Sequence, residues 1–182
     1  MPLSSQDRAR LIALARSAVE AQVRGAEPPE PLELSGILGE RRGCFVTLTN
    51  HDRLRGCIGT FQPAGPLGET LLHMGQAAAQ DPRFYDNPIT AAELPQLLVE
   101  VSVLSPLIET AEPLRLQVGT HGIYIVRGPY AGCFLPEVAT DMGWSAQEFL
   151  DECCAGKAGL PAGAWRLPGT KVFLFTSEKF QS

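Results

Sequence analysis

Two turns flanked by strand-like segments constrain the fold of this chain more than any other feature. The first is a short polar turn between residues 44–49 (CFVTLT) and 54–59 (LRGCIG). The second is a Gly-Pro turn between residues 122–127 (GIYIVR) and 133–135 (CFL). Strands joined by short turns pair in an antiparallel manner, because a parallel pair needs a crossover of a dozen or more residues. The sequence therefore predicts two β-hairpins.

The other segments add helices without any regular alternation of strand and helix. Apolar periodicity and capping residues predict helices over residues 4–27, 66–79 and 145–154. Residues 97–104 (LLVEVSVL) predict a further strand, and residues 172–176 (VFLFT) a last one. This order predicts the α+β class, mainly an antiparallel sheet with flanking helices. We expect a single domain over residues 1–182, in which the helix of residues 1–27 is packed on the body or linked to it.

Composition excludes several classes of protein. Of the 182 residues, 45% are hydrophobic and 19% charged, which excludes a disordered chain. The net charge of −5 argues against a nucleic-acid-binding domain, which normally has a basic face. Five cysteines without a Cys-x-x-Cys pair predict neither a disulfide framework nor a zinc site. The sequence shows no signal-peptide pattern and no apolar segment long enough to span a membrane, so we expect a cytoplasmic protein.

The segment of residues 54–59 combines a cation, a thiol and two glycines. Alternation along a strand would place Arg55, Cys57 and Gly59 on one face and Gly56 on the other. A guanidinium near a thiol favours the nucleophilic thiolate. The glycines mark places where a ligand or another part of the backbone approaches closely. The alternative is that Cys57 is a small buried apolar residue beside tight packing.

Glu100 is anomalous because it lies inside the apolar run of residues 97–104. An ionised carboxylate there needs a partner. Arg55 is the best candidate, since it too lies within a predicted strand. An Arg55–Glu100 pair either fixes only the packing of the strands or forms the wall of a pocket beside Cys57.

His121 lies in a glycine-flanked turn directly before a predicted strand. A histidine in such a loop can serve as a base or ligand, or it can be an ordinary turn residue. A Cys57–His121 dyad, with Glu100 orienting the imidazole, is one possible arrangement. No nucleotide-binding loop and no recognised metal spacing is present, so the sequence identifies neither a metal nor a cofactor.

The order of these motifs resembles the AMMECR domain family, whose prokaryotic members are called AmmeMemoRadiSam system protein A. The hexapeptide LRGCIG at residues 54–59 matches the family signature. Further matches follow in order at residues 81–84 (DPRF), 100–104 (EVSVL), 121–122 (HG), 135–138 (LPEV), 144 (W) and 157–160 (KAGL). The chain departs from the family pattern at Glu137, usually a glutamine, and at Tyr85, where a proline often stands.

The resemblance implies a compact α+β fold with a larger and a smaller lobe, and it places the signature near a cleft. It also implies Memo-type and radical-SAM proteins as partners, because their genes often accompany those of the family. It implies no settled activity.

Two functional hypotheses follow. In the first, the chain is a small-molecule-binding enzyme or enzyme-system subunit whose pocket uses Cys57, Arg55, Glu100 and His121, with Gly56 and Gly59 admitting the ligand. In the second, it is a non-catalytic interaction or scaffold domain.

Overall fold

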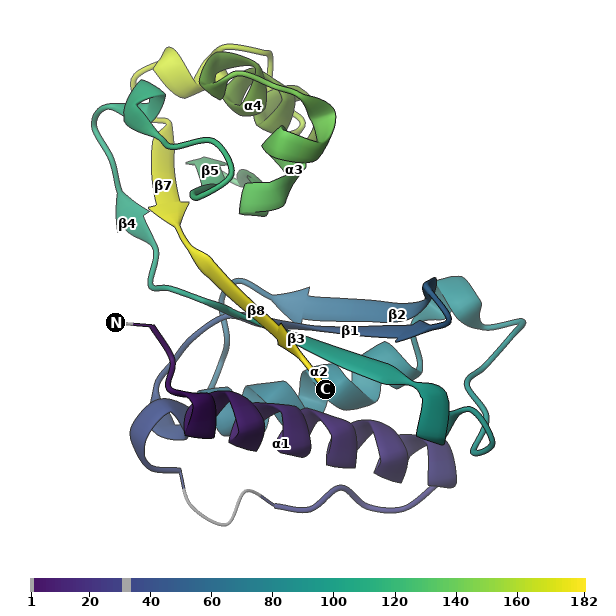
Figure 1. The fold of residues 1–182 in the computed structure, drawn as a ribbon. Coiled ribbons are helices and arrows are strands. Elements are labelled where there is room, and N and C mark those ends of the chain that lie inside the picture. Colours follow the sequence, from purple (N-terminus) through teal and green to yellow (C-terminus); the bar gives the residue numbers. More distant parts are fainter. Residues whose placement is uncertain (1, 31–33) are drawn as a thin grey trace. The chain divides into compact units, whose positions relative to one another are not determined.

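The computed structural model describes residues 2–30 and 34–182, which form two compact units (Figure 1). The first unit runs to Leu104 and includes Glu178–Ser182 from the end of the chain. The second unit is Ser105–Ser177. Each contains its own four-stranded sheet and its own apolar core.

The first unit packs two helices on one side of its sheet (Figure 1). The strand order is β2-β1-β3-β8, and both β2 and β3 pair antiparallel with β1. Its elements are α1 (Ser5–Arg24), β1 (Cys44–Asn50), β2 (Arg53–Thr60), α2 (Leu67–Ala79), β3 (Leu98–Leu104) and β8 (Ser177–Gln181), with 3-10 turns at Gly36–Gly39, Pro82–Phe84 and Leu94–Gln96.

Alternation along β1 builds the core of this unit. Cys44, Val46 and Leu48 are completely buried on the helix-facing side of the sheet, together with Val99 and Val101 of the neighbouring strand. Burial raises the pKa of the Cys44 thiol to about 12, as expected for a cysteine that serves as an apolar core residue.

A β-bulge in β2 changes which side chains share a face. The register passes from Leu48 opposite Gly56 to Thr49 opposite Leu54, so Arg55 is the extra, unpaired residue. Cys57 lies opposite Thr47, on the face away from the helices. Simple alternation therefore does not hold between Arg55 and Cys57, and Leu54, opposite Thr49, joins the face of Cys57, opposite Thr47.

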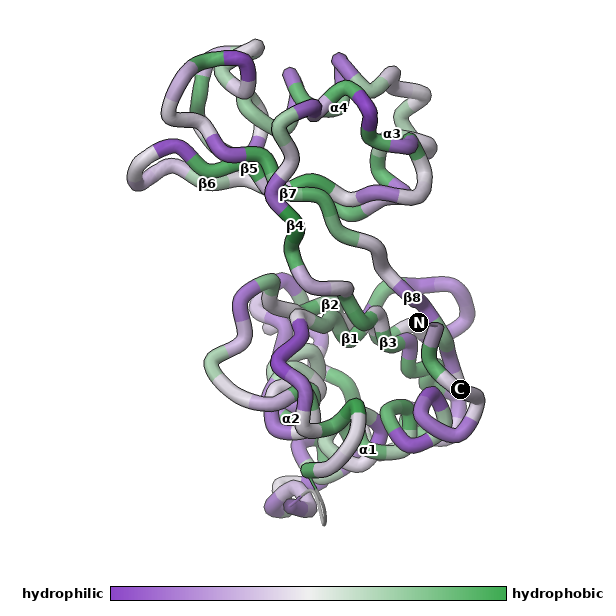
Figure 2. Tube along the Cα trace, turned by 90° about the vertical axis from the view of Figure 1, so that its left-hand side faces the viewer, coloured by the Kyte–Doolittle hydropathy of each residue, from purple (hydrophilic) through white to green (hydrophobic). Residues whose placement is uncertain are grey.

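The second unit has the strand order β4-β7-β5-β6, and all its pairs are antiparallel. In Figure 2, β5 and β7 are green along most of their length, as expected for central strands. Its elements are β4 (Ile108–Glu109), β5 (Gly122–Arg127), β6 (Tyr130–Phe134), α3 (Pro136–Met142), α4 (Ala146–Cys153) and β7 (Lys171–Phe175), with 3-10 turns at Pro113–Arg115 and Ala164–Arg166 and a π-helical turn at Cys154–Ala158.

The structure confirms the α+β class with antiparallel sheets and corrects several details. The second hairpin turns through Gly128 and Pro129 alone, because Arg127 pairs directly with Tyr130. Helix α3, a short helix with Pro136 in its first turn, was not among the predicted helices. The segment of residues 172–176 is not the last strand, since β8 follows it. No described helix is long and apolar enough to cross a membrane.

Gly56 offers a test of the packing between β2 and α2. A Cβ atom added there would collide with the carbonyl oxygen of Ala78. We expect Gly56→Ala to lower the free energy of unfolding by about 2–4 kcal/mol, because backbone must move to accommodate the methyl group. Gly156→Ala is the control, since its added Cβ would meet nothing within 4 Å. Equal urea midpoints for the two variants would contradict this account of the contact.

Candidate functional site

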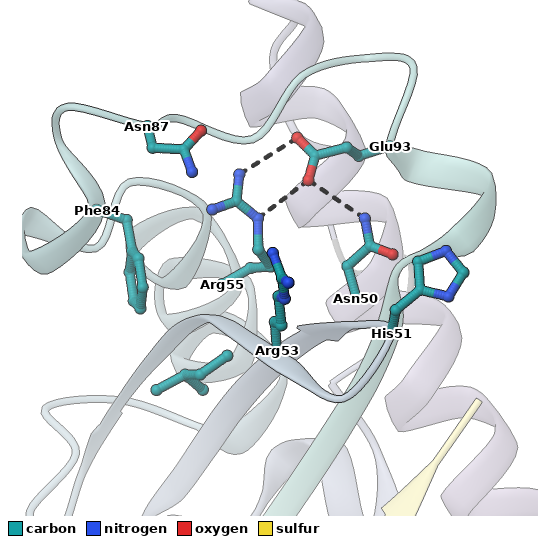
Figure 3. Close-up of a pocket in the computed structure, with 8 residues that line it drawn as sticks. Asn50, His51, Arg53, Arg55, Phe84, Asn87 and Glu93 are labelled. Atoms are coloured by element: carbon teal, nitrogen blue, oxygen red, sulfur yellow. Dashed lines mark hydrogen bonds and ion pairs between the residues drawn. The ribbon is translucent and has the colours of Figure 1, made fainter.

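A cleft of about 620 Å³ lies between the tip of the β1–β2 hairpin and the loop that leads to β3 (Figure 3). Both walls belong to the first unit. The lining residues are Asn50, His51, Arg53, Leu54, Arg55, Phe84, Asn87 and Glu93. Three of these come from the family-like hexapeptide or its immediate neighbour, which places part of the signature at the cleft.

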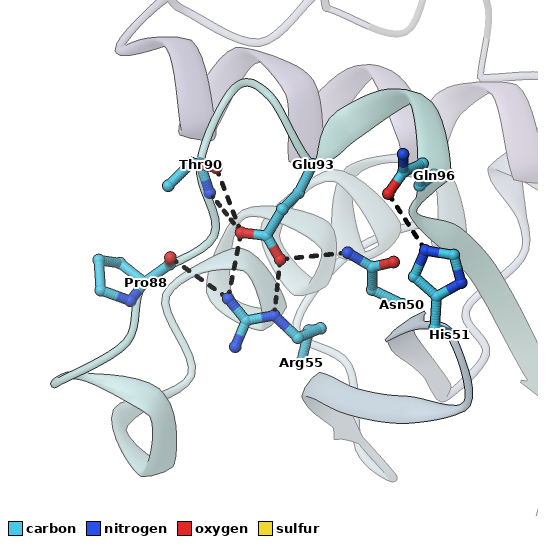
Figure 4. Close-up of polar contacts among 7 residues, drawn as sticks. All are labelled: Asn50, His51, Arg55, Pro88, Thr90, Glu93 and Gln96. Atoms are coloured by element: carbon cyan, nitrogen blue, oxygen red, sulfur yellow. Dashed lines mark hydrogen bonds and ion pairs between the residues drawn. The ribbon is translucent and has the colours of Figure 1, made fainter.

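An ion pair joins Arg55 and Glu93, two of the residues that line the cleft (Figure 4). Arg55 Nε donates to Glu93 Oε1 at 3.0 Å and Nη2 to Oε2 at 3.3 Å, and Nη2 also donates to the Pro88 carbonyl. The Arg55 side chain is only 9% exposed. A bidentate pair of this kind fixes both the position and the orientation of the guanidinium.

Further donors hold the Glu93 carboxylate. The Thr90 N–H donates to Oε2 at 2.9 Å, and Asn50 Nδ2 donates to Oε1 at 3.3 Å. These hydrogen bonds, with that of Arg55 the strongest, lower the pKa of Glu93 to about 2. Glu93 is therefore ionised at neutral pH, and it links the hairpin to the loop.

The hairpin tip is strained where it borders the cleft. His51 and Asp52 have φ values of 47° and 61° and are the only residues other than glycine with positive φ in the described chain. Two consecutive left-handed residues make the tight turn that matches the twist of a hairpin, a conformation that glycine and asparagine adopt more cheaply. The His51 ring contacts the Gln96 side chain at 3.2 Å, which anchors the tip to the loop.

Two cationic groups remain available to a ligand. Arg53 is exposed, and its side chain has no hydrogen bond or ion pair to any described residue. Arg55 Nη1 also has no partner among the described residues. Since it is not among the buried atoms that lack a partner, it is accessible to solvent. The cleft thus presents N–H donors from two neighbouring guanidinium groups.

The DPRF segment clamps the outer edge of β2 at Cys57. Asp81 Oδ2 accepts the Cys57 N–H at 2.9 Å, and Arg83 Nη2 donates to the Cys57 carbonyl at 3.2 Å. Arg83 also hydrogen-bonds to Asp81 and holds the pKa of that buried carboxyl well below its usual range. The clamp satisfies backbone groups that an edge strand would otherwise expose.

Cys57 and Glu100 do not line the cleft, and both lie on the sheet face away from the helices. Thr47 is opposite both residues in the register, and its hydroxyl contacts the Cys57 thiol at 3.1 Å. Glu100 pairs with Lys179 at 3.8 Å. The expected Arg55–Glu100 pair is therefore wrong, because Arg55 pairs with Glu93 and Glu100 pairs with Lys179.

His121 belongs to the second unit. Its Nδ1 accepts the Gln117 N–H at 3.0 Å, so the ring closes its own turn. The glycines of the hexapeptide contact the chain itself: a Cβ at Gly56 would strike α2, and one at Gly59 would strike the ring of Phe45. Of the two alternatives for these glycines, close approach of other parts of the protein is the one observed.

Sequence reasoning missed Glu93, Arg53 and Asn50 as site residues. The Thr90-x-x-Glu93 pattern was available, but it predicts only a helical turn, and Glu93 does accept the Thr90 N–H. No local signal shows that the same carboxylate also binds Arg55. Among the described residues, no group of three or more His, Cys, Asp or Glu side chains is arranged to hold a metal ion.

Comparison with known proteins places nearly the whole chain in one family. The AMMECR1 family profile matches residues 12–180. The chain belongs to the AMMECR1 family. It is 44% identical to Protein TK0174 of Thermococcus kodakarensis, covering 94% of this chain and 88% of that protein. Protein NEQ441 of Nanoarchaeum equitans is 38% identical over 94% of this chain and 98% of its own length.

A solved structure of an AMMECR1-like relative has the same fold. The crystal structure of the protein PH0010 from Pyrococcus horikoshii superposes with a TM-score of 0.79 at 39% identity, covering 95% of this chain and 90% of that one. The resemblance carried by the hexapeptide and the motifs that follow it is thereby confirmed.

The Glu93 carboxylate makes a prediction about acid stability. Because its pKa is lower in the folded state than in the unfolded chain, it stabilises the fold above about pH 5, and this contribution is lost as the pH falls towards 2. We expect Glu93→Gln to lower the free energy of unfolding at pH 7 by about 1–3 kcal/mol and to make its decline below pH 5 shallower. Urea titrations from about pH 7 to 2.5 measure both effects.

Glu27→Gln is the control for this experiment, because Glu27 is exposed and has no ion pair to a described residue. If Glu93→Gln and Glu27→Gln showed the same pH dependence, the Arg55–Glu93 pair would not be a stabilising contact in solution.

Proposed function

We propose that this AMMECR1-family chain binds a small anionic molecule in the cleft at the hairpin tip, as the ligand-binding part of an enzyme or enzyme system. The observation that carries the proposal is the pair of unused guanidinium donors, on Arg53 and at Nη1 of Arg55, inside a cleft of about 620 Å³. Small-molecule sites are concave spaces of about 300–1,000 Å³ with a few fixed polar groups.

The environment of Arg55 suits it to hold an anion. Glu93 and the Pro88 carbonyl fix the guanidinium in advance, so a ligand need not immobilise a long side chain. A planar guanidinium presents parallel N–H groups that match the geometry of carboxylate and phosphate. Arg53 adds a positive charge that no described residue neutralises.

A second candidate chemistry rests on Cys57, which lies on the sheet face away from the helices. Burial raises the pKa of the thiols of Cys44, Cys133, Cys153 and Cys154. Cys57 is half-buried, with a hydroxyl at 3.1 Å. We propose that Cys57 is the thiol of this chain that takes part in nucleophilic or redox chemistry, with Glu100 on the same face. Participation of His121 from the second unit remains a proposal that rests on residue type alone.

Memo-type and radical-SAM proteins are proposed partners on the strength of the family resemblance alone. The scaffold hypothesis predicts that the signature serves only to stabilise the fold. Cys57→Ser and Arg55→Gln distinguish the two: loss of the folded state in both supports a structural role, whereas a stable variant that loses ligand binding or thiol reactivity supports a site.

Arg53 allows a direct test of anion binding. We expect chloride-free titrations with acetate or inorganic phosphate to shift the amide NMR signals of residues 50–55 and 84–93 in a saturable manner. Arg53→Gln should weaken this binding at least about fivefold, because it removes the unneutralised charge. Arg10→Gln, which changes an exposed and unpaired arginine on α1, is the control. Unchanged affinity in Arg53→Gln would contradict the proposal.

Alkylation tests the second candidate. We expect iodoacetamide at about pH 8 to modify Cys57 before the other four cysteines, because burial, which is only partial at Cys133, raises the pKa of their thiols. Peptide mass spectrometry identifies the modified residue, and Cys57→Ser should abolish the rapid phase. If Cys57 stayed unmodified up to about pH 8.5 while Cys133 reacted, a thiolate role for Cys57 would be excluded.

A further inference from the structure

We infer that the ligand of the hairpin cleft is a monoanion with a flat apolar body, in the simplest case an aryl carboxylate. This inference rests on the proposed function and goes beyond it by naming the ligand class. It depends on the charges that line the cleft, on the apolar side chains beside them, and on how the two are placed relative to each other.

The charge of the lining favours one negative charge on the ligand. Apart from the imidazole of His51, the charged lining side chains are Arg53, Arg55 and Glu93. Glu93 stays ionised at neutral pH, so the three together carry one net positive charge. A dianion such as phosphate would exceed this net charge, and its excess charge would repel the Glu93 carboxylate, which is paired with the same Arg55 guanidinium.

The apolar lining favours a flat body. Phe84 lies on the wall opposite Asn50 and Glu93, with Arg53 and Arg55 between the two walls (Figure 3). Leu54 is 39% exposed and also lines the cleft, although it belongs to a strand whose other apolar side chain, Ile58, packs on the core. An aromatic ring in contact with Phe84 and Leu54 would bury apolar surface of both, and its contact with the Phe84 ring adds an attraction specific to aromatic pairs.

The cationic groups and the Phe84 ring line the same cleft (Figure 3). With its carboxylate on the guanidinium groups between the walls, a small ligand would contact Phe84 with its apolar body. The exposed amide of Asn87 stands on the same side as Phe84 and offers both a donor and an acceptor (Figure 3). A hydroxyl or amino substituent on the ring would meet this amide.

Titrations of the intact protein at about pH 8 with four probes test the ligand class. Benzoate combines the charge with the ring, acetate has the charge alone, benzamide has the ring alone, and inorganic phosphate is the dianion. We expect benzoate to bind at least about fivefold more tightly than acetate, phosphate to bind more weakly than benzoate, and benzamide to produce no saturable shift. Cyclohexanecarboxylate, of similar size but not flat, should bind more weakly than benzoate.

Two neighbouring aromatic residues provide matched variants. Phe84→Leu should reduce the affinity for benzoate about three- to tenfold and leave that for acetate unchanged. Tyr85→Leu should change neither, because Tyr85 is 85% exposed and lies outside the cleft lining. Circular dichroism checks that each variant is folded, and the comparison of benzoate with cyclohexanecarboxylate needs no variant.

The possible outcomes separate this inference from the proposed function. Tighter binding of phosphate than of benzoate, or equal binding of benzoate and acetate, would overturn the ligand class while leaving anion binding in place. A loss of acetate affinity in Phe84→Leu as large as that of benzoate would overturn the role of the ring. The absence of any anion binding, in wild type as in Arg53→Gln, would refute the proposed function itself.

Discussion

The buried guanidinium of Arg55 is the constraint on which the candidate site depends. A cation that is 9% exposed requires a fixed counter-charge, and Glu93 supplies it from a segment more than thirty residues further along the chain. Satisfying Glu93 then involves Asn50 and Thr90, and satisfying Arg55 involves Pro88. The hairpin tip and the loop before β3 are thereby held at one distance, and the cleft is the space between them.

The need of a buried charge for fixed partners also explains the contacts of the DPRF segment. Asp81 and Arg83 pair with each other and bind both backbone groups of Cys57, so the open edge of the first sheet is closed by side chains rather than by another strand. One loop is therefore anchored to β2 at positions two residues apart, by the Arg55–Glu93 ion pair and by the hydrogen bonds of Asp81 and Arg83 to the Cys57 backbone. The hexapeptide therefore has a structural role in addition to any role in binding. Gly56 allows α2 to pack closely, the backbone of Cys57 hydrogen-bonds to the DPRF segment, and the Arg55 side chain binds the loop before β3.

Much of the fold could be predicted from local patterns. Turn chemistry located both hairpins, and Ser145 and Glu148 do form the reciprocal capping box of α4. The errors concern features that depend on distant parts of the chain. Residue 55 is an extra residue in β2 only because its neighbours pair with Leu48 and Thr49 of β1, so simple alternation does not hold across it. β8 is a strand only because the sheet of the first unit accepts it.

The sequence by itself determined the α+β class, the family and the segment on which the candidate site is centred, because these follow from local periodicity, turns and a contiguous motif. Only the tertiary structure decided the partners. It paired Arg55 with Glu93 rather than Glu100, left the Arg53 side chain free of described partners, kept Cys57 out of the cleft lining and assigned His121 to the second unit. The physical reason is that a buried charge is neutralised by whichever group the folded chain brings to it, and proximity in space is not encoded in the spacing of residues.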